Sequence, residues 1–161
     1  MARSIEIPST AGDHFYRLWV LLNQVMHVAH KAQQRELSPA HVSVIEASVL
    51  FVLANAKGPV TPAEMARWTL REGHSTSMLL DRMSVKGLIT KTKDLKYKHL
   101  IRLALTEKGR MAYKQSQKFD SIKGILSSLS EEERQQLDAS LRKLRDAALA
   151  ELAITNPMPF P

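Results

Sequence analysis

The 161-residue chain contains no cysteine, and it lacks several other features that would indicate particular functions. Without cysteine it forms no disulfide bond and has no thiol nucleophile, thiol redox sensor or cysteine-rich zinc site. A glycine-rich phosphate loop, a nucleophile elbow and a paired-acid motif are also missing, so we expect no enzymatic activity. No apolar run approaches the ~18 residues of a membrane-spanning helix, and residues 1–8 contain no apolar core of a signal peptide. The sequence therefore predicts a cytoplasmic protein with no membrane partner.

The positive charge is concentrated in one segment. The chain has 23 Lys and Arg against 16 Asp and Glu, for a net charge of +7. Residues 86–118 hold ten of the cations and two of the anions, so this fifth of the chain accounts for the whole net charge. Such a segment indicates a polyanionic partner. The alternative is a solvated face that only maintains solubility, but the cations alternate with apolar residues as in a strand, which favours nucleic acid.

The length predicts one domain, and its first part shows helical periodicity. Apolar residues at steps of three and four predict a long amphipathic helix from residue 13 to about residue 35. Ser38 and Pro39 are expected to provide the N-cap and first residue of a second, buried helix that continues to about residue 56. Residues 61–64 have the Thr-x-x-Glu spacing of a capping box, which predicts a short third helix.

The next part of the chain has the pattern of a winged helix-turn-helix. A fourth helix is expected to begin at His74 or Ser75 and to end at Lys86-Gly87, with glycine at its C-cap. It follows the third helix after a tight turn, which is the helix-turn-helix arrangement. Residues 88–93 and 100–105 then alternate with a period of two, which predicts a hairpin with a charged loop.

Two further helices and a tail complete the predicted order of elements. Residues 106–109 open a long helix whose apolar side continues to Leu129. The sequence Ser130-Glu131-Glu132-Glu133 provides a capping box and three acids at the positive end of the last helix, which extends to about Leu152. The last six residues include three prolines, which predicts a disordered tail.

Four short motifs make this order of elements more specific. They are residues 61–64, Leu80-Asp81-Arg82-Met83, Lys86-Gly87-Leu88-Ile89 and Leu105-Thr106-Glu107-Lys108-Gly109. Over about residues 13–152 their joint spacing resembles the MarR family of dimeric bacterial transcription regulators. The resemblance implies a mainly α fold with a small β-hairpin wing, a winged helix-turn-helix with N- and C-terminal dimerisation helices. It also implies a homodimer that binds a pseudo-palindromic site in double-stranded DNA and represses transcription until a small ligand loosens binding.

The resemblance also divides the chain into functional parts. The dimerisation helices are expected at about residues 13–36 and 106–152, and the DNA-binding lobe at about residues 39–105, with a tail at 153–161. The helix from His74 to Lys86 matches the recognition helix of the family. Its predicted DNA-binding residues are Ser75, Thr76, Ser77, Met78 and Arg82. Small hydroxyl side chains allow close approach to the major groove, and a methionine can contact a thymine methyl group.

The wing departs from the family pattern. Where the family usually has Asp-x-Arg near the tip, this chain has Tyr97-Lys98-His99. We therefore expect cationic side chains to contact phosphates in place of an arginine in the minor groove. The predicted wing and phosphate contacts are Lys86, Lys91, Lys93, Lys96, Lys98 and His99.

Several side chains are candidates for a ligand pocket or a metal site. Tyr16, Trp19, Met26, Phe51 and Trp68 lie near the expected junction of the arm helices and the DNA-binding lobe. Core packing explains any one of them, but the resemblance adds the alternative that Trp19, Met26, Phe51 and Trp68 line a pocket for an apolar or aromatic effector. We expect no cofactor. His27 and His30 could share a helix face, but two imidazoles do not complete a metal site, so we favour a role without metal.

Two other functions are compatible with a winged helix. One is RNA binding, but the basic segment has no exposed aromatic platform on which single-stranded bases would stack. The other is a protein-interaction module without a nucleic-acid partner, which the excess of positive charge disfavours.

Overall fold

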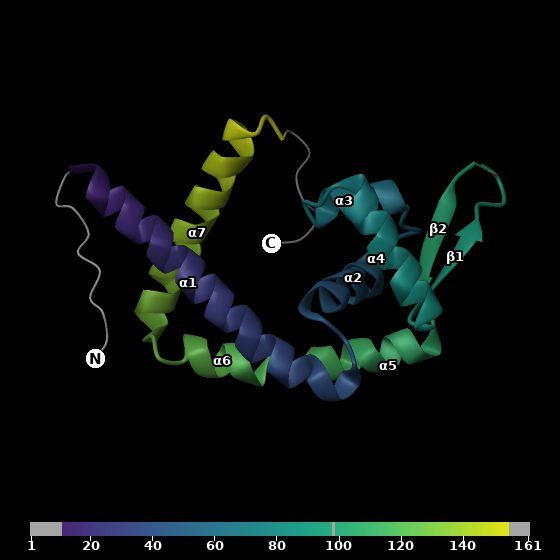
Figure 1. The fold of residues 1–161 in the computed structure, drawn as a ribbon, viewed down its shortest axis with the longest axis horizontal. Coiled ribbons are helices and arrows are strands. Elements are labelled where there is room, and N and C mark those ends of the chain that lie inside the picture. The colour runs from purple at the N-terminus through teal and green to yellow at the C-terminus, as the bar shows by residue number, and fades with distance from the viewer. Residues whose placement is uncertain (1–10, 98, 155–161) are drawn as a thin grey trace, which may run out of the picture.

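The computed structural model describes residues 11–97 and 99–154, and within them the chain is mainly helical with one β-hairpin (Figure 1). The elements are α1 (Ala11–Leu37), the 3-10 turn η1 (Ser38–Ala40), α2 (Val44–Asn55), α3 (Pro62–Trp68), α4 (Gly73–Val85), β1 (Ile89–Lys93), β2 (Ile101–Leu105), α5 (Glu107–Ser116), α6 (Asp120–Leu126) and α7 (Glu131–Glu151). This confirms the predicted fold class. The predicted contact Lys98 and most of the predicted tail lie outside the described residues.

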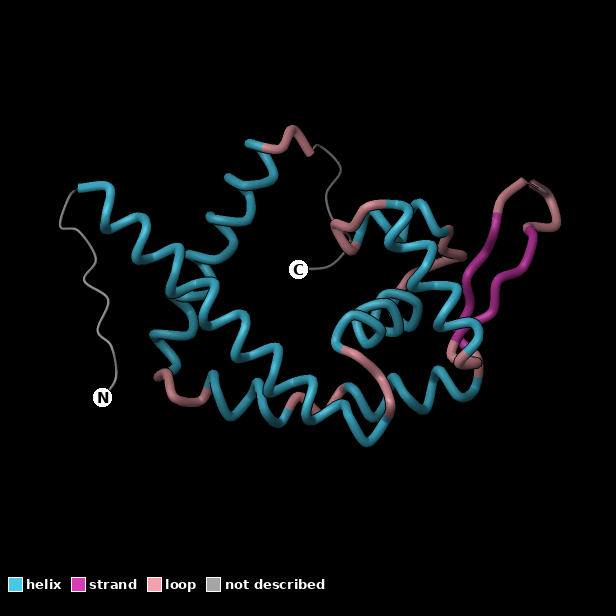
Figure 2. The backbone as a smooth tube through the Cα atoms, in the orientation of Figure 1, coloured by secondary structure: helices cyan, strands magenta, loops and turns pink. Residues whose placement is uncertain are grey.

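The helices form a lobe and a pair of arms, as the traces of Figures 1 and 2 show. Helices α2, α3 and α4 gather beside the hairpin in the lobe, and α1, α6 and α7 lie on the other side. Helix α5 packs against α2 and leads from the hairpin to α6, which packs against α1. The end of α1 and helix α5 thus connect the lobe to the arms.

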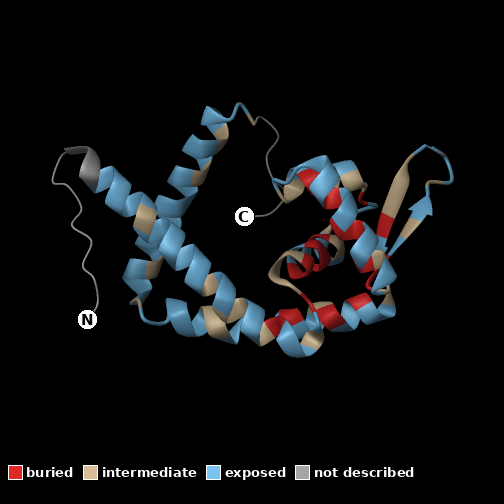
Figure 3. Cartoon of the chain, viewed as in Figure 1, coloured by how far each residue is buried: buried red, intermediate tan, exposed pale blue. Residues whose placement is uncertain are grey.

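The core lies in the lobe, where most of the buried residues in Figure 3 are found. Its largest fully buried apolar side chains are Leu50, Met65, Leu79, Leu80, Met83 and Ile89. The two strands pair antiparallel, with Ile89 opposite Leu105, and Val60 adds a bridge to Leu103. This pairing fixes the hairpin to the core at its base. The arms are exposed along most of their length.

Capping boxes begin three of the helices. In α3 the Thr61 side chain accepts from the backbone N–H of Glu64 while the Glu64 carboxylate accepts from Thr61, and α7 begins in the same way. These two caps were predicted. The predicted N-cap of α2 is wrong, because Ser38 opens the 3-10 turn and His41 then adopts a left-handed conformation with φ of 54°. Ser43 is the N-cap, in a capping box with Glu46.

The predicted long helix after residue 106 is divided into α5 and α6. The chain turns at Phe119, which has a left-handed φ of 51° and provides no side-chain cap for α6. Glu36 of α1 caps α6 instead, accepting from the backbone N–H groups of Asp120 at 2.9 Å and Ser121 at 3.0 Å. A contact between distant segments therefore caps the start of α6.

Within the described residues no single helix is long and apolar enough to cross a membrane. The segment His14–Ala40 and helix α2, which meet at a bend of 73°, have the required length and apolar composition only when they are taken together.

Candidate nucleic-acid interface

Helix α4 has one buried face and one exposed face. Thr76, Leu79, Leu80 and Met83 are buried, and their spacing of three and four residues forms one stripe along the helix. The exposed residues of α4 are Gly73, His74, Ser75, Ser77, Met78, Asp81, Arg82 and Val85. The helix is therefore held to the lobe along one side and presents polar and apolar groups along the other.

The predicted recognition residues divide between these faces. Ser75, Ser77, Met78 and Arg82 are exposed, and Met78 has 55% of its surface accessible. Thr76 is only 1% exposed, because it falls in the same stripe as the buried leucines. The prediction that Thr76 faces DNA is therefore wrong.

Exposed residues of the same helix also lie outside the predicted set. His74 lies on the exposed face near the start of α4, and Val85, near its end, is 90% exposed. The helical period that placed Leu79 and Met83 in the core could have placed both residues on the opposite face. The exposed face of α4 therefore extends over the whole length of the helix.

The start of α4 suits a contact with a phosphate. Its N-cap, Glu72, makes no side-chain hydrogen bond to the first turn. Backbone N–H groups of the first turn of a helix point along its axis, and the helix dipole favours an anion there. The glycine at the first position and the exposed serine two residues later add no large side chain that would obstruct such a contact.

The wing carries exposed cations on a loop that is organised by Asp94. One carboxylate oxygen of Asp94 accepts from the backbone N–H groups of Lys96 at 2.8 Å and Tyr97 at 2.7 Å. The other accepts from the Arg102 Nε at 2.6 Å. The Arg102 bond and then the Tyr97 amide hold the pKa of Asp94 below its ordinary value, against a smaller opposing effect of burial. This loop therefore keeps an ionised carboxylate at its base.

The predicted wing residues differ in their exposure and in their contacts with other side chains. Lys93 and His99 are exposed, and Lys96 is also exposed, with its Nζ 5.3 Å from the centre of the Tyr97 ring. Lys91 donates to Asp81 of α4 at 2.5 Å, which ties β1 to the exposed face of α4. The wing and α4 thus form one continuous surface.

Lys86, at the end of α4, is bound within the protein. Its Nζ donates to both carboxylate oxygens of Glu46, at 2.8 and 2.9 Å, and to the His41 carbonyl at 3.3 Å. Lys86 is the C-cap of α4, a position predicted to be glycine, and Gly87 follows it with a left-handed φ of 70°. The hydrogen bonds of Lys86 direct its ammonium to Glu46, while 45% of the side chain stays exposed, so the predicted phosphate contact of Lys86 stays a prediction.

A cavity of about 450 Å³ lies between α1, α2, α5 and the end of α3. Its lining residues are His30, Gln33, Val44, Ile45, Ala47, Ser48, Phe51, Val52, Trp68, Thr69, Tyr113, Ser116, Gln117 and Phe119. Phe51 and Trp68 were predicted to line a pocket. Trp19 and Met26 do not line this cavity, and they are 63% and 50% exposed on α1. The four candidates therefore do not form one lining.

Polar groups stand at one side of this cavity. The Tyr113 hydroxyl oxygen accepts from the Asn55 side-chain amide at 2.8 Å and from that of Gln117 at 2.7 Å. His30 lines the cavity from α1. No group of three His, Cys, Asp or Glu residues able to hold a metal occurs among the residues that the structure describes, so His27 and His30 have no such third ligand there.

Comparison with known proteins identifies the fold. A family model described as the MarR family matches residues 42–96. The ligand-free structure of the organohalide-sensing transcriptional regulator RdhR is 32% identical, with a TM-score of 0.83, and the match covers 99% of each chain. The chain belongs to the MarR family. The 2,4-dichlorophenol-bound form of RdhR is 30% identical over the same share of both chains, with a TM-score of 0.84.

Two other MarR-family structures contain DNA. The S. aureus MepR–DNA complex is 25% identical with a TM-score of 0.70, and the match covers 80% of this chain and 96% of that one. A mutant of E. coli MarR complexed with operator DNA has a TM-score of 0.77 at 21% identity, covering 84% and 99% of the two chains, and shows the fold alone. A search of curated proteins finds no match. The resemblance stated from the four sequence motifs is therefore confirmed.

Proposed function

We propose that this MarR-family chain is a repressor of transcription that binds a pseudo-palindromic DNA operator as a homodimer and releases it when a small aromatic effector binds. The observation that carries the proposal is the exposed face of α4 beside a wing that bears free cations. A major groove about 12 Å wide accepts one helix, and an adjoining cationic hairpin can follow the phosphates.

The two parts of this surface have different tasks in the proposal. Exposed Ser75, Ser77 and Met78 near the start of α4 contact base edges, where sequence is read. Lys93 and Lys96 on the wing contact phosphates, which position the protein and carry no sequence information. The DNA-bound structure of MepR, at 25% identity, supports duplex DNA as the partner.

The arms provide the apolar surface for a homodimer. Exposed apolar side chains on α1 and α7 include Phe15, Leu18, Trp19, Val25, Met26, Leu137, Leu141 and Leu144. A stretch of this extent on a small protein usually marks an interface. Two-fold symmetry would place the two α4 helices roughly 34 Å apart, one turn of DNA, and would require matching half-sites.

The cavity between α1, α2 and α5 is the proposed effector site. It has aromatic walls from Phe51 and Trp68 and a volume suited to a small ligand. The Tyr113 hydroxyl already accepts two hydrogen bonds, so its own proton is available to a ligand oxygen. A phenol or aromatic acid offers both a ring and such an oxygen, and RdhR, a relative of similar length, was solved with 2,4-dichlorophenol bound.

Selection of genomic DNA tests the first part of the proposal. Fragments retained by the purified full-length protein are sequenced and compared with the input DNA. We expect enrichment of an inverted repeat whose half-sites are centred about one helical turn apart. Enrichment of no sequence over the input would contradict the proposal.

Tryptophan fluorescence tests the effector site, because only one of the two tryptophans lines the cavity. A Trp19→Phe variant retains Trp68 as its single tryptophan, and we expect 2,4-dichlorophenol to quench it and to release the selected fragment. The matched control is Trp68→Phe, which retains Trp19 and should show no quenching. A ligand shifts DNA affinity only by its difference in affinity for the two states, so quenching without release would contradict a regulatory role.

A further inference from the structure

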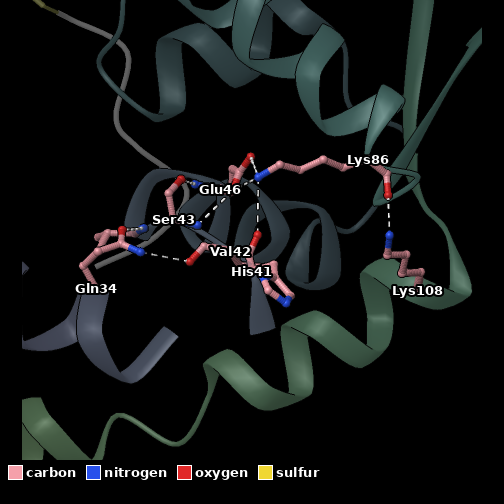
Figure 4. Close-up of polar contacts among 8 residues, drawn as sticks. Gln34, His41, Val42, Ser43, Glu46, Lys86 and Lys108 are labelled. Atoms are coloured by element: carbon pink, nitrogen blue, oxygen red, sulfur yellow. Dashed lines mark hydrogen bonds and ion pairs between the residues drawn. The ribbon is translucent and has the colours of Figure 1, made fainter. Parts of the chain in front are cut away.

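An ion pair between the buried carboxylate of Glu46 and the Lys86 ammonium, whose side chain is 45% exposed, joins the end of α4 to the start of α2 (Figure 4). Glu46 is 3% exposed, and its two carboxylate oxygens accept from the Lys86 Nζ at 2.8 and 2.9 Å. One of these oxygens also accepts from the Ser43 backbone N–H at 2.8 Å. A buried carboxylate requires such partners, because an unpaired charge in the interior is costly.

The same carboxylate has two structural tasks. It completes the capping box of α2, and it anchors the residue that forms the C-cap of α4. Burial raises the pKa of Glu46, but the bonds from Lys86 and from Ser43 outweigh it, so the net pKa lies below the ordinary value. The Glu46 carboxylate is therefore ionised at neutral pH.

Neighbouring hydrogen bonds connect the chain around the Glu46–Lys86 pair to α1 on one side and to α5 on the other. From α1, the Gln34 side chain donates to the Val42 carbonyl at 3.3 Å and accepts from the Val44 N–H at 3.1 Å. From α5, the Lys108 Nζ donates to the Lys86 carbonyl at 2.7 Å. As Figure 4 shows, side chains of α2 and α5 contact Lys86 at the end of α4, whereas Gln34 of α1 contacts the segment that leads into α2.

We propose that Glu46 and Lys86 are positioning residues, which fix the orientation of α4 for sequence-specific DNA binding, and that Lys86 makes no phosphate contact. This inference rests on the proposed function and adds the residues that determine its specificity. The Lys86 ammonium is directed toward Glu46 of α2 and away from the exposed face of α4. A contact that requires side-chain groups to meet base edges is sensitive to a small rotation of α4, whereas phosphate contacts from the flexible wing lysines are less so.

The test compares two DNA duplexes across a range of salt concentrations. One is the fragment selected from the genome, and the other is a duplex of unrelated sequence. We expect Lys86→Met to lower affinity for the selected fragment at least about tenfold, to leave affinity for the unrelated duplex unchanged, and to leave the salt slope unchanged. A phosphate contact would instead lower both affinities and reduce the salt slope by about 1.8, because a dimer would lose two such contacts.

The Glu46→Gln variant separates the two roles more sharply. If Lys86 acts through Glu46, this variant should lose the same specificity as Lys86→Met. If Lys86 binds phosphate, releasing it from the carboxylate should leave DNA affinity unchanged or increase it. The double variant with both substitutions should lose no more than either single one, because residues in one interaction are not additive.

A wing variant and a measurement of folding serve as controls for the Glu46 and Lys86 variants. Lys93→Met on the wing should weaken binding to both duplexes alike and reduce the salt slope. Removing one partner of a buried pair can destabilise a protein, so circular dichroism at the assay temperature checks folding, and the double variant leaves no unpaired charge if a single variant unfolds. A specificity that all three Glu46 and Lys86 variants retain would overturn the inference alone. A wild-type protein that prefers no sequence would overturn the proposed function itself, and this inference with it.

Discussion

Replacing Glu36 by Ala is expected to weaken the joint between α1 and α6. The Glu36 carboxylate accepts from the backbone N–H groups of Asp120 and Ser121 and from the Ser121 hydroxyl. No side chain of the N-cap residue replaces these bonds, because Phe119 has a left-handed backbone and an apolar side chain. Glu36→Ala therefore leaves the first turn of α6 without its acceptor.

The expected loss is about 1 kcal/mol. Removal of a helix N-cap acceptor costs about 0.5–2 kcal/mol, and the partial exposure of Glu36 places it near the middle of that range. For a chain of this length the loss corresponds to a decrease in Tm of about 2–4 °C. Calorimetry at one fixed protein concentration measures it, because stability of a dimer depends on concentration. Glu132→Ala, an exposed acid in the first turn of α7, is the control for the loss of one carboxylate.

The pH dependence provides the sharper test. The Ser121 hydroxyl and N–H, then the Asp120 N–H and the charge of Lys123, lower the pKa of Glu36 below its ordinary 4.5, against an opposing effect of burial. The stabilisation is therefore fully present above pH 4.5 and is lost as the pH falls through the folded-state pKa. We expect the Tm difference between wild type and Glu36→Ala to shrink in that window. A difference below about 0.5 °C at pH 7, or one that grows on acidification, would show that the Glu36 carboxylate does not stabilise the start of α6.

Three other expectations follow from local contacts. Gly109→Ala should destabilise the protein by about 1–3 kcal/mol or more in thermal unfolding, since a Cβ there would lie 2.0 Å from the Leu88 carbonyl oxygen, and an unchanged Tm would disprove the close packing. Asp94→Ala should speed amide hydrogen exchange in the wing loop without changing exchange in α2. Equal exchange rates of the loop amides in wild type and variant would show that the carboxylate does not organise the loop. In binding assays, Met78→Ala should change the preference among operator variants by roughly 1–3 kcal/mol, whereas Lys96→Ala should weaken binding to every sequence alike. The reverse pattern would show that α4 does not contact the bases.

Local signals explain what the sequence predicts well. The caps of α3 and α7 depend on side chains three residues apart, so Thr61 with Glu64 and Ser130 with Glu133 are visible in the sequence. The hairpin is visible because the apolar period changes from about 3.6 to 2 after Gly87. The same periodic analysis, applied to each residue of α4, would have assigned Thr76 to the core.

The missed features depend on contacts between distant segments. The start of α6 is capped by Glu36, which lies 84 residues earlier in the chain, so no local sequence pattern predicts the break between α5 and α6. Lys86 counts as one of the cations in the basic segment, but its charge is paired with Glu46 from 40 residues away. Trp19 has the same helical spacing as a core residue, although its face of α1 is exposed in the single chain. Periodicity shows that a side chain belongs to an apolar face but does not show what covers that face.

The most direct test of the central claim is the salt dependence of DNA binding measured on the selected operator fragment and on an unrelated duplex. If α4 and the wing form the DNA-binding surface, a dimer that contacts 6–10 phosphates should lose about 10³–10⁵ in affinity between 50 and 200 mM salt. At the higher salt concentration it should still bind the operator about 10³-fold or more tightly than the unrelated duplex. Equal affinity for the two duplexes, or affinity that does not change with salt, would contradict the account.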